Sequence, residues 1–237
     1  MASARETADQ PIGAIVDATP AERPGPVTLA GRFCRIEKLD PDKHGAALWQ
    51  AVKTDAAVWT YMGYGPFADA AGFQRWLEER AVLLDPYSYA VIESDSGQAV
   101  GIVTLMEIRP SMRVIEVGNI VYSPKLQRTS AATEAQYLLA RYVFEDLGYR
   151  RYEWKCNALN APSMRAARRF GFKFEGIFRQ HMIVKGRNRD TAWFAMTDGD
   201  WPAAKRAYER WLDQANFDGE GGQRESLSAL NGVGAAR

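Results

Sequence analysis

Histidine and cysteine are scarce in this chain of 237 residues, which contains two of each. Cys34 and Cys156 lie in separate predicted strands, without CxxC spacing and without a nearby histidine cluster. A disulfide framework or a zinc site is therefore not expected, and the pattern favours a reducing cytoplasm. His44 and His181 are not accompanied by a GxSxG-type segment, so a Ser-His-Asp hydrolase is not supported.

Long apolar runs and an excess charge of one sign are also missing. No apolar run is long enough to cross a bilayer, and the formal net charge is +1. A dedicated nucleic-acid surface or a membrane-binding face is therefore not expected. The chain has no Walker loop and no strand-linked GxGxxG segment, so nucleotide hydrolysis and dinucleotide redox chemistry lack their usual motifs.

The chain is long enough for one sizeable domain with its own core, which we place at residues 26–217. Hydrophobic residues make up 46% of the chain and charged residues 25%, as in ordinary globular proteins. Residues 1–25 lack the continuous apolar core of a secretion signal, so we expect a flexible arm and no secretion. Residues 218–237 are rich in Gly and Ser, and we expect a disordered tail.

Alternating and helical hydrophobic patterns, punctuated by Gly and Pro, predict a mixed sequence of strands and helices. The expected order is a β-hairpin at 27–39, a helix opened by Asp40 and Pro41, a helix at about 69–84, strands at 87–94, 99–108 and 113–123, a helix ending near Gly148, a strand at 149–157, a short basic helix ending at Gly171, strands at 172–186 and 190–197, and a helix opened by Asp200. This order predicts a single mixed α/β (α+β) domain, antiparallel in its first half, with one βαβ unit around the long helix.

Glycine is missing from one place where chemistry would favour it. The stretch "LQRTSAATEA" leads from a strand into the long helix, and no glycine occurs between Val121 and Phe144. A helix N-terminus offers unpaired N–H groups and a partial positive charge, so such a junction can bind a phosphate. Phosphate loops are usually rich in glycine. The residues alone therefore leave two hypotheses, a phosphate cradle or a solvated loop capped by Thr129 or Ser130.

Two motifs in this order of elements resemble the GNAT superfamily of acetyl-coenzyme A-dependent N-acetyltransferases. The pyrophosphate loop Q/R-x-x-G-x-G/A is matched by Gln127–Ala132, and N-x-x-S before a basic helix ending in G-F is matched by Asn160–Ser163 and Phe170–Phe172. The resemblance covers residues 27–197 and is strongest to the branch that acetylates the N-termini of ribosomal proteins. Ser130 departs from the pattern, because it stands where the first glycine is usual.

The resemblance implies a mostly antiparallel twisted sheet flanked by helices, in which two central parallel strands splay apart. The pantetheine arm of acetyl-CoA would enter that gap, beside the backbone of Ile120 and Val121, and an amide near Val121 would stabilise the thioester oxyanion. The diphosphate would bind to the loop residues Gln127, Arg128, Thr129, Ser130, Ala131, Ala132 and Thr133. No metal is implied.

The second motif has both a structural and a functional interpretation. Asn160 is a natural helix cap, and Ser163 can add a local hydrogen bond. The resemblance implies that Asn160 also holds the end of the pantetheine and that Ser163 protonates the leaving thiolate. Arg165 and Arg168 would contact the 3′-phosphate of the coenzyme, or else belong to a solvated basic helix face.

Glu116 and Asn119 lie on the strand that the resemblance places beside the thioester. Acetylation needs a neutral amine, and a carboxylate can take the proton directly or through a water molecule. Glu116 is the candidate base, with a solvated Glu or a pair with Arg113 as the alternative. Strict alternation puts Asn119 on the opposite face, whereas a bulge at Gly118 would reset the count and make Asn119 a contact for the acceptor or the acetyl carbonyl.

The acceptor pocket would be built from the loop "VWTYMGYGPF" and the late strands. Its candidate residues are Trp59, Tyr61, Tyr64, Phe67 and His181, although an aromatic cluster of this kind is often core. The expected activity is acetyl transfer from acetyl-CoA to a primary amine, a peptide N-terminus or a small molecule, by direct attack in a ternary complex. Open alternatives are a non-catalytic acyl-CoA-binding module, a different donor such as succinyl-CoA, and either a monomer or a homodimer.

Overall fold

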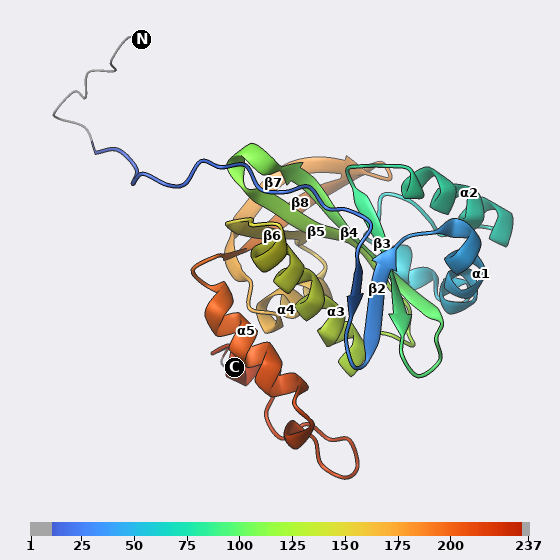
Figure 1. The fold of residues 1–237 in the computed structure, drawn as a ribbon. Helices are drawn as coiled ribbons and strands as arrows, with labels where there is room; N and C mark the ends of the chain where they lie inside the picture. Colours follow the sequence, from blue (N-terminus) through green and yellow to red (C-terminus); the bar gives the residue numbers. More distant parts are fainter. Residues whose placement is uncertain (1–10, 234–237) are drawn as a thin grey trace.

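The computed structural model describes residues 11–233, which form an eight-stranded sheet with helices on both faces (Figure 1). The strand order is β1-β2-β3-β4-β5-β6-β8-β7, and only β5 and β6 are parallel neighbours. The elements are β1 (Thr28–Ala30), β2 (Cys34–Lys38), α1 (Pro41–Val52), α2 (Ala70–Ala81), β3 (Tyr87–Glu93), β4 (Ala99–Arg109), β5 (Val114–Tyr122), α3 (Ser130–Arg141), β6 (Arg151–Asn157), α4 (Ala161–Arg169), β7 (Lys173–Val184), β8 (Arg187–Thr197), α5 (Trp201–Leu212) and α6 (Leu227–Leu230). The predicted mixed α/β class is confirmed.

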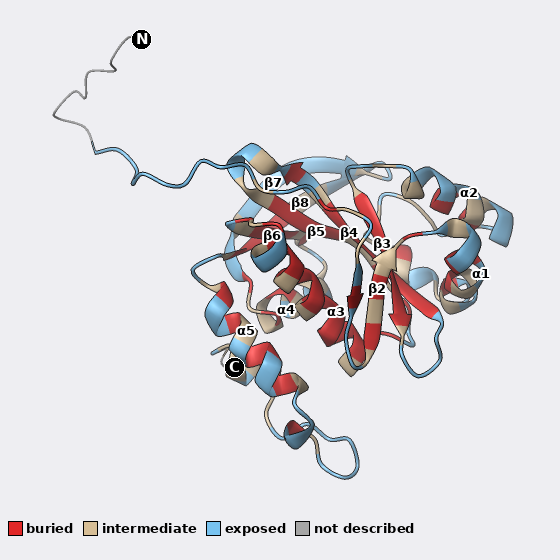
Figure 2. Ribbon diagram, in the orientation of Figure 1, coloured by how far each residue is buried: buried red, intermediate tan, exposed pale blue. Residues whose placement is uncertain are grey.

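Two hydrophobic cores lie on opposite faces of the sheet. The larger core joins the sheet to α3 and α5, and the smaller one joins it to α1 and α2. Figure 2 shows the buried residues concentrated on the strands and on the inner sides of these helices. Alternate residues of β4 serve the two cores, since Val103 belongs to the first and Ile102 to the second. On the face of the sheet against which α1 and α2 pack, these helices leave the part formed by β5, β6, β8 and β7 less covered (Figure 1).

Local signals place most helix starts where the sequence predicts them. The Asp40 carboxylate accepts hydrogen bonds from the N–H groups of Asp42 and Lys43, 3.0 and 3.1 Å away, and so caps α1. The helix α2 ends at Ala81 and not at Leu84, which is 69% exposed. Asp85 precedes Pro86, and a residue before proline disfavours helical backbone angles. The expected helix end near residue 84 is therefore wrong.

The long helix after the glycine-free loop changes character near its end. The helix α3 ends at Arg141, and residues Tyr142–Asp146 continue as a π-helical turn. Gly148 follows with φ +74, in the left-handed region that favours glycine at a helix end. The predicted stop at Gly148 is confirmed, although the last turn before it is wider than an α-helix.

The described part of the C-terminal segment differs from the disordered tail that its composition predicts. Leu227 on α6 is fully buried in the larger core, and the Asn231 side chain donates to the Arg169 carbonyl at 2.9 Å. The Gly- and Ser-rich residues before Leu227 form the connection that lets this apolar residue reach the core. Composition averaged over the tail therefore hid a short anchoring helix. Residues 234–237 lie outside the described residues.

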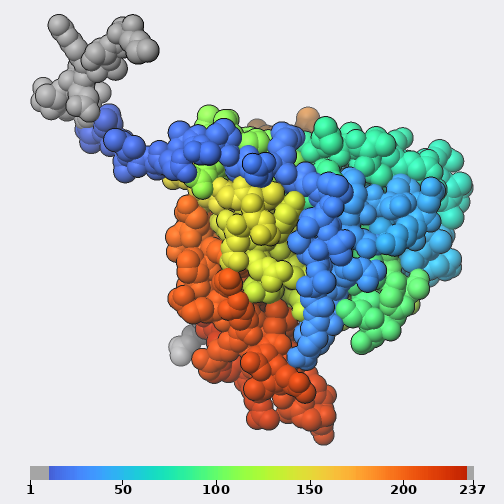
Figure 3. All heavy atoms as spheres, in the orientation of Figure 1, coloured from blue at the N-terminus to red at the C-terminus, as the bar shows by residue number. Residues whose placement is uncertain are grey.

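The N-terminal arm has no regular secondary structure over its described residues 11–25, yet its last part is held by the domain. The N–H groups of Ala21 and Glu22 donate to the carbonyls of Pro110 and Leu147, at 3.1 and 2.9 Å. Figure 3 shows the last part of this segment, in blue, lying along the upper edge of the molecule, while its earlier part extends away from the surface. Residues 1–10, on which part of the flexible-arm prediction falls, lie outside the described residues.

A carboxylate on α3 fixes the first hairpin to the helix that follows the loop. Glu134 is 5% exposed and accepts hydrogen bonds from the N–H groups of Arg32, Phe33 and Cys34, at 2.8, 2.6 and 2.8 Å. A side chain at Gly31 would collide with the Glu134 carboxylate. The sequence predicts a β-hairpin at 27–39, and the structure adds that this close approach requires glycine at position 31.

Candidate active site

The strands β5 and β6 part in the middle of the sheet. Their ladder runs from Val114, opposite Arg151, to Val117, opposite Trp154. Beyond this pair β5 continues to Tyr122 and β6 to Asn157, and no further ladder pair of the described chain joins them. The predicted splay is confirmed. It leaves backbone groups of both strands available to a ligand that enters between them.

A bulge in β5 coincides with the start of the splay. The register between β4 and β5 shifts between Ile102 and Thr104, and Asn119 has φ +47. Asn119 Nδ2 lies 3.4 Å from Thr104 Oγ1 and 3.6 Å from Met106 Sδ. The Met106 thioether would also collide with any side chain at Gly118, next to the Glu116 carboxylate. The bulge thus places Asn119 on the Glu116 side of the sheet, which strict alternation would not.

The Glu116 carboxylate is buried beside one lysine. Glu116 Oε2 lies 2.8 Å from Lys155 Nζ, and the Glu116 side chain is 7% exposed. Lys155 Nζ also lies 3.0 Å from Glu153 Oε2. Burial raises the pKa of Glu116 to about 7, because the attraction of Lys155 offsets only part of the desolvation and the charges of Glu153 and Glu107 add to it. A carboxyl with this pKa can exchange a proton near neutral pH.

The alternative pair of Glu116 with Arg113 does not form. The Arg113 guanidinium donates to the Gly148 carbonyl at 2.8 Å and reaches Asp17 Oδ2 at 3.4 Å. Arg113 has φ +53 and belongs to the turn before β5, so its side chain extends to the end of the sheet and away from Glu116. The solvated-Glu alternative is likewise wrong, since Glu116 is 5% exposed.

The glycine-free loop is closed by its own hydrogen bonds. Thr129 caps α3, because its Oγ1 accepts from the Ala132 N–H at 3.1 Å while donating to the Leu126 carbonyl at 2.7 Å. The Gln127 amide donates to the Tyr122 carbonyl at 2.8 Å. The positive φ of the loop falls on Arg128, +63, and not on Ser130. Serine at position 130 therefore meets no conformational penalty.

The first turn of α3 presents small groups and free donors. The side chains of Ala131 and Ala132 are 5% and 6% exposed and pack into the larger core. The N–H groups of Ser130 and Ala131 donate no hydrogen bond to another described residue, as expected for a helix start. Thr133 Oγ1 accepts from Arg169 Nη1 at 3.0 Å, which joins this turn to α4.

The helix α4 begins beside the splay. The Asn160 side chain accepts from the Ser163 N–H at 3.2 Å, so Asn160 is the predicted cap. Ser163 Oγ accepts from Trp154 Nε1 at 3.0 Å. Trp154 is the last residue of β6 that pairs with β5, so this hydrogen bond holds the hydroxyl close to the point of splay.

The arginines of α4 have different surroundings. Arg165 is exposed, whereas the Arg168 guanidinium lies over the rings of Phe174 and Phe194, at 5.5 and 5.3 Å. Arg168 is therefore partly engaged by cation–π contacts in the protein itself. Arg165 is the arginine of the predicted pair that projects into solvent.

The aromatic loop after α1 belongs largely to the smaller core. Trp59 is 2% exposed, and its ring packs edge-on against Tyr64 at 6.1 Å and Phe67 at 5.2 Å. For the Trp59 side chain the structure thus favours the core over a pocket wall. Tyr61 differs, because its hydroxyl donates to the Leu159 carbonyl at 3.1 Å and links this loop to the start of α4.

The hairpin of β7 and β8 also contacts the aromatic loop after α1. Lys185 Nζ donates to the carbonyls of Trp59 and Gly65, at 3.1 and 2.6 Å. His181 Nδ1 lies 3.0 Å from Thr191 Oγ1, and the ring of Phe178 lies 4.5 Å from that of Trp193. The Lys155 ammonium lies 4.1 Å from the Trp193 ring centroid. The aromatic loop, the hairpin and the Glu116 side of the sheet are therefore brought together.

The sequence alone did not single out Lys155, Trp193 and Phe178. Lys155 occurs in the strand "RYEWKCN", two residues after Glu153, and alternation places both side chains on one face. The parallel register puts Glu153 opposite Glu116, and that register is the information needed to bring Lys155 to the candidate base. Trp193 lies opposite Lys155 in the antiparallel ladder of β6 and β8.

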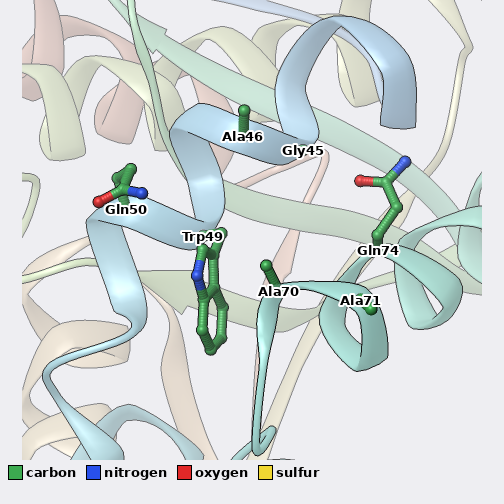
Figure 4. A pocket seen from close by; sticks show the side chains of 7 residues that line it. All are labelled: Gly45, Ala46, Trp49, Gln50, Ala70, Ala71 and Gln74. Carbon is green, nitrogen blue, oxygen red and sulfur yellow. The ribbon is translucent and has the colours of Figure 1, made fainter.

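A separate hollow of about 410 Å³ lies between α1 and α2 (Figure 4). It is lined by Gly45, Ala46, Trp49, Gln50, Ala70, Ala71 and Gln74. None of these side chains is titratable or nucleophilic, and none belongs to the splay. The chemistry-bearing residues therefore lie elsewhere. Among residues 11–233 no group of three or more metal-ligating side chains occurs, and no helix is long and apolar enough to cross a membrane.

Comparison with known proteins agrees with this geometry. A family model described as an acetyltransferase (GNAT) domain matches residues 35–173. The structure is similar to a GCN5-related N-acetyltransferase from Brucella melitensis, with 48% identity and a TM-score of 0.89 over 91% of this chain and 99% of that one. It is also similar to a probable GNAT-family acetyltransferase from Chromobacterium violaceum, with 41% identity and a TM-score of 0.77 over 82% and 98%.

Two more distant matches are also described as acetyltransferases. An uncharacterized N-acetyltransferase, YokL of Bacillus subtilis, is 26% identical over 54% of this chain and 71% of its own length. A RimL ribosomal L7/L12 α-N-protein acetyltransferase shares 19% identity over 72% of this chain and 94% of its own, with a TM-score of 0.62. At that identity the likeness is one of fold.

Proposed function

Because these matches show that the chain belongs to the GNAT family of N-acetyltransferases, we propose that it transfers an acetyl group from acetyl-CoA to a primary amine by direct attack in a ternary complex. The observation that carries the proposal is the buried Glu116 carboxylate beside the splay of β5 and β6. The splay supplies a place for the acyl donor, and Glu116 supplies a proton acceptor for the amine. The acceptor is a peptide N-terminus or a small-molecule amine.

The residues around the splay fit the acyl-CoA that the family requires. Beyond Val117 the edge of β5 that faces β6, at Ile120 and Val121, has no ladder partner among the described residues and is positioned to hold the pantetheine arm as an added strand would. The free N–H groups at the start of α3 and the small side chains of the loop Gln127–Thr133 suit a diphosphate. Arg165 projects into solvent from α4, where it can meet the 3′-phosphate.

In the proposed reaction Glu116 takes a proton from the acceptor, directly or through a water molecule. The neutral amine attacks the thioester carbonyl, and an amide near Val121 stabilises the oxyanion. Asn119, turned to the Glu116 side by the bulge, contacts the acceptor or the acetyl carbonyl. When the C–S bond breaks, Ser163 donates its proton to the leaving thiolate and regains one from a water molecule. The Trp154 N–H donates to the Ser163 oxygen and leaves the hydroxyl proton free for this role.

The test is release of free thiol from acetyl-CoA in the presence of a panel of amines. We expect release that depends on the amine, together with the acetylated amine detected by mass spectrometry. Binding of acetyl-CoA without transfer to any amine would replace the proposal with a non-catalytic acyl-CoA-binding module. Faster transfer from succinyl-CoA than from acetyl-CoA would show that succinyl-CoA is the preferred donor, with the fold and the site as described.

The glycine-free loop gives a separate prediction for coenzyme binding. Ser130→Trp is expected to weaken binding of CoA by about tenfold or more, because a bulky side chain at the helix start keeps the diphosphate from its N–H groups. Ser130→Gly is expected to leave the affinity unchanged or to increase it, since glycine keeps the N–H and removes the Cβ. Isothermal titration calorimetry measures both.

Ser111→Trp is the matched control, because Ser111 is exposed in the turn between β4 and β5, at the other end of β5 from the loop. Position 132 is less suitable for this test, since a larger side chain there would overpack the core around Ala132. Equal CoA affinity in Ser130→Trp and Ser111→Trp would show that the loop does not bind the diphosphate.

A further inference from the structure

Lys155 is the cation closest to the candidate base and has no role in the reaction outlined above. We propose that Lys155 is a positioning residue that holds the Glu116 carboxylate charged and directed at the splay, so that it sets the lower pH limit of catalysis. The inference rests on the proposed function of Glu116. Its geometric basis is the 2.8 Å contact between Lys155 Nζ and Glu116 Oε2, with the Lys155 side chain 11% exposed.

The position of Lys155 along β6 places its ammonium where the two strands separate. Trp154 is the last β6 residue in the ladder with β5, and Lys155 follows it directly. The backbone on one side of Lys155 is thus fixed by the sheet, while the other side opens into the gap. A charged group at this junction acts on Glu116 through a short, poorly solvated path, where Coulomb interactions are strong.

Trp193 and Glu153 restrict where the ammonium can go. The Lys155 Nζ lies 4.1 Å from the Trp193 ring centroid and 3.0 Å from Glu153 Oε2. Phe178 in turn supports the indole, with the two rings 4.5 Å apart. An ammonium held between two carboxylates and an aromatic face has little freedom to swing into solvent. The arrangement keeps a lysine charge beside Glu116, which a freely moving surface lysine would not do.

The two carboxylates depend on Lys155 to different degrees. Glu153 has further cations, because Arg109 Nη2 lies 2.8 Å from its Oε2 and Arg151 Nε lies 2.7 Å from its Oε1. Among the described residues Glu116 has Lys155 as its one ion-pair partner. Loss of the lysine charge therefore leaves Glu153 ionised and paired, while Glu116 remains buried next to a negative charge.

The other charged groups that act on Glu116 all oppose its ionisation. Burial raises the pKa of Glu116 most, Lys155 lowers it, and Glu153 on β6 and Glu107 on β4 raise it further. Removing Lys155 therefore raises the pKa of Glu116 further. Since the base must be deprotonated to act, the acid limb of the activity profile then moves to higher pH.

The experiment compares Lys155→Met, Lys155→Arg and the wild type, by kcat/KM across pH with an acceptor found in the amine panel. For Lys155→Met we expect the acid limb to move up by about one pH unit or more, which is about a fivefold or greater loss at pH 7, about a tenfold loss at pH values well below 7, and a recovery in alkaline buffer. Lys155→Arg keeps a cation and is expected to keep the wild-type limb. Lys205→Met removes an exposed ion pair with Glu145 and serves as the control.

The shape of the profile separates a positioning role from a structural one. A merely structural Lys155 would lower the rate of Lys155→Met by the same factor at every pH, with the acid limb unmoved, and this result would overturn the proposal. The proposal is also overturned if the acid limb of Lys155→Arg moves to higher pH as far as that of Lys155→Met, because the positive charge of the side chain is then not the property that matters.

A second readout does not need activity. Titration of the side-chain carboxyl carbons by NMR on ¹³C-labelled protein, with the Glu116 signal identified by its loss in Glu116→Gln, gives the midpoint of Glu116 directly. We expect that midpoint to rise in Lys155→Met. An unchanged midpoint overturns the inference about Lys155, whereas a raised midpoint in a protein that acetylates no amine overturns the proposed function and leaves the coupling of the two residues standing.

Discussion

Glu116→Gln lowers kcat/KM for the amine acceptor by about 10²–10⁴-fold, the range found when a general base is removed. Glutamine keeps the shape of the side chain but cannot take a proton from the acceptor. In the wild type, activity rises with pH through an inflection near 7, because burial raises the pKa of Glu116 to about that value and only the ionised form acts as base. In the variant this inflection disappears. Steady-state kinetics across pH measure both effects.

Two controls separate the loss of a base from damage to the fold. Glu93→Gln changes a glutamate on β3, outside the splay, and should keep the wild-type rate and profile. Unfolding of Glu116→Gln is expected to match wild type near pH 4.5, and in alkaline buffer the variant is expected to be at least as stable as wild type. A carboxyl whose pKa is raised on folding makes the folded wild type less stable as pH rises from about 4.5 to about 7, and glutamine is free of this effect. An undiminished rate with the inflection still present would remove Glu116 from the mechanism.

Glu134→Ala lowers the free energy of unfolding by about 3–5 kcal/mol, because it leaves three backbone N–H groups of the first hairpin without their charged acceptor. Hydrogen bonds to a charged group are each worth about 1.5–3 kcal/mol and are not additive, so the total stays below their sum. The side chain also joins the hairpin to α3, whose first turn belongs to the proposed diphosphate site. Urea denaturation followed by circular dichroism measures the change.

The matched control is Glu79→Ala, which removes an exposed glutamate from α2 and should change stability by about 0.5 kcal/mol or less. Glu134→Gln should fall between the two, since an amide oxygen accepts hydrogen bonds but carries no charge. A loss below about 1 kcal/mol for Glu134→Ala would show that water replaces the carboxylate at little cost.

Local signals in the sequence predict the order of elements well, because helix starts and turns are encoded by adjacent residues. Asp40 with Pro41, and Asn160 with Pro162, mark helix starts that the structure confirms. The splay follows from the family resemblance, and the register of β5 and β6 shows it directly. Element ends are less well encoded, as the early stop of α2 before Asp85 and Pro86 illustrates.

Partners far apart in the chain are not predictable from such signals. The contact of Glu116 with Lys155 depends on the parallel register of two strands, and that of Glu134 with the residues after Gly31 joins positions about a hundred residues apart. Leu227 shows the same limit, since a Gly- and Ser-rich composition describes the tail and misses one buried side chain. In each case the tertiary arrangement, and not the local sequence, selects the partner.

The most direct test of the account is a crystal structure of the protein with acetyl-CoA bound. We expect the pantetheine arm between β5 beyond Val117 and β6 beyond Trp154, with the diphosphate at the start of α3 and the thioester within reach of Glu116. Acetyl-CoA bound elsewhere, for example in the hollow between α1 and α2, with the splay empty, would contradict the account.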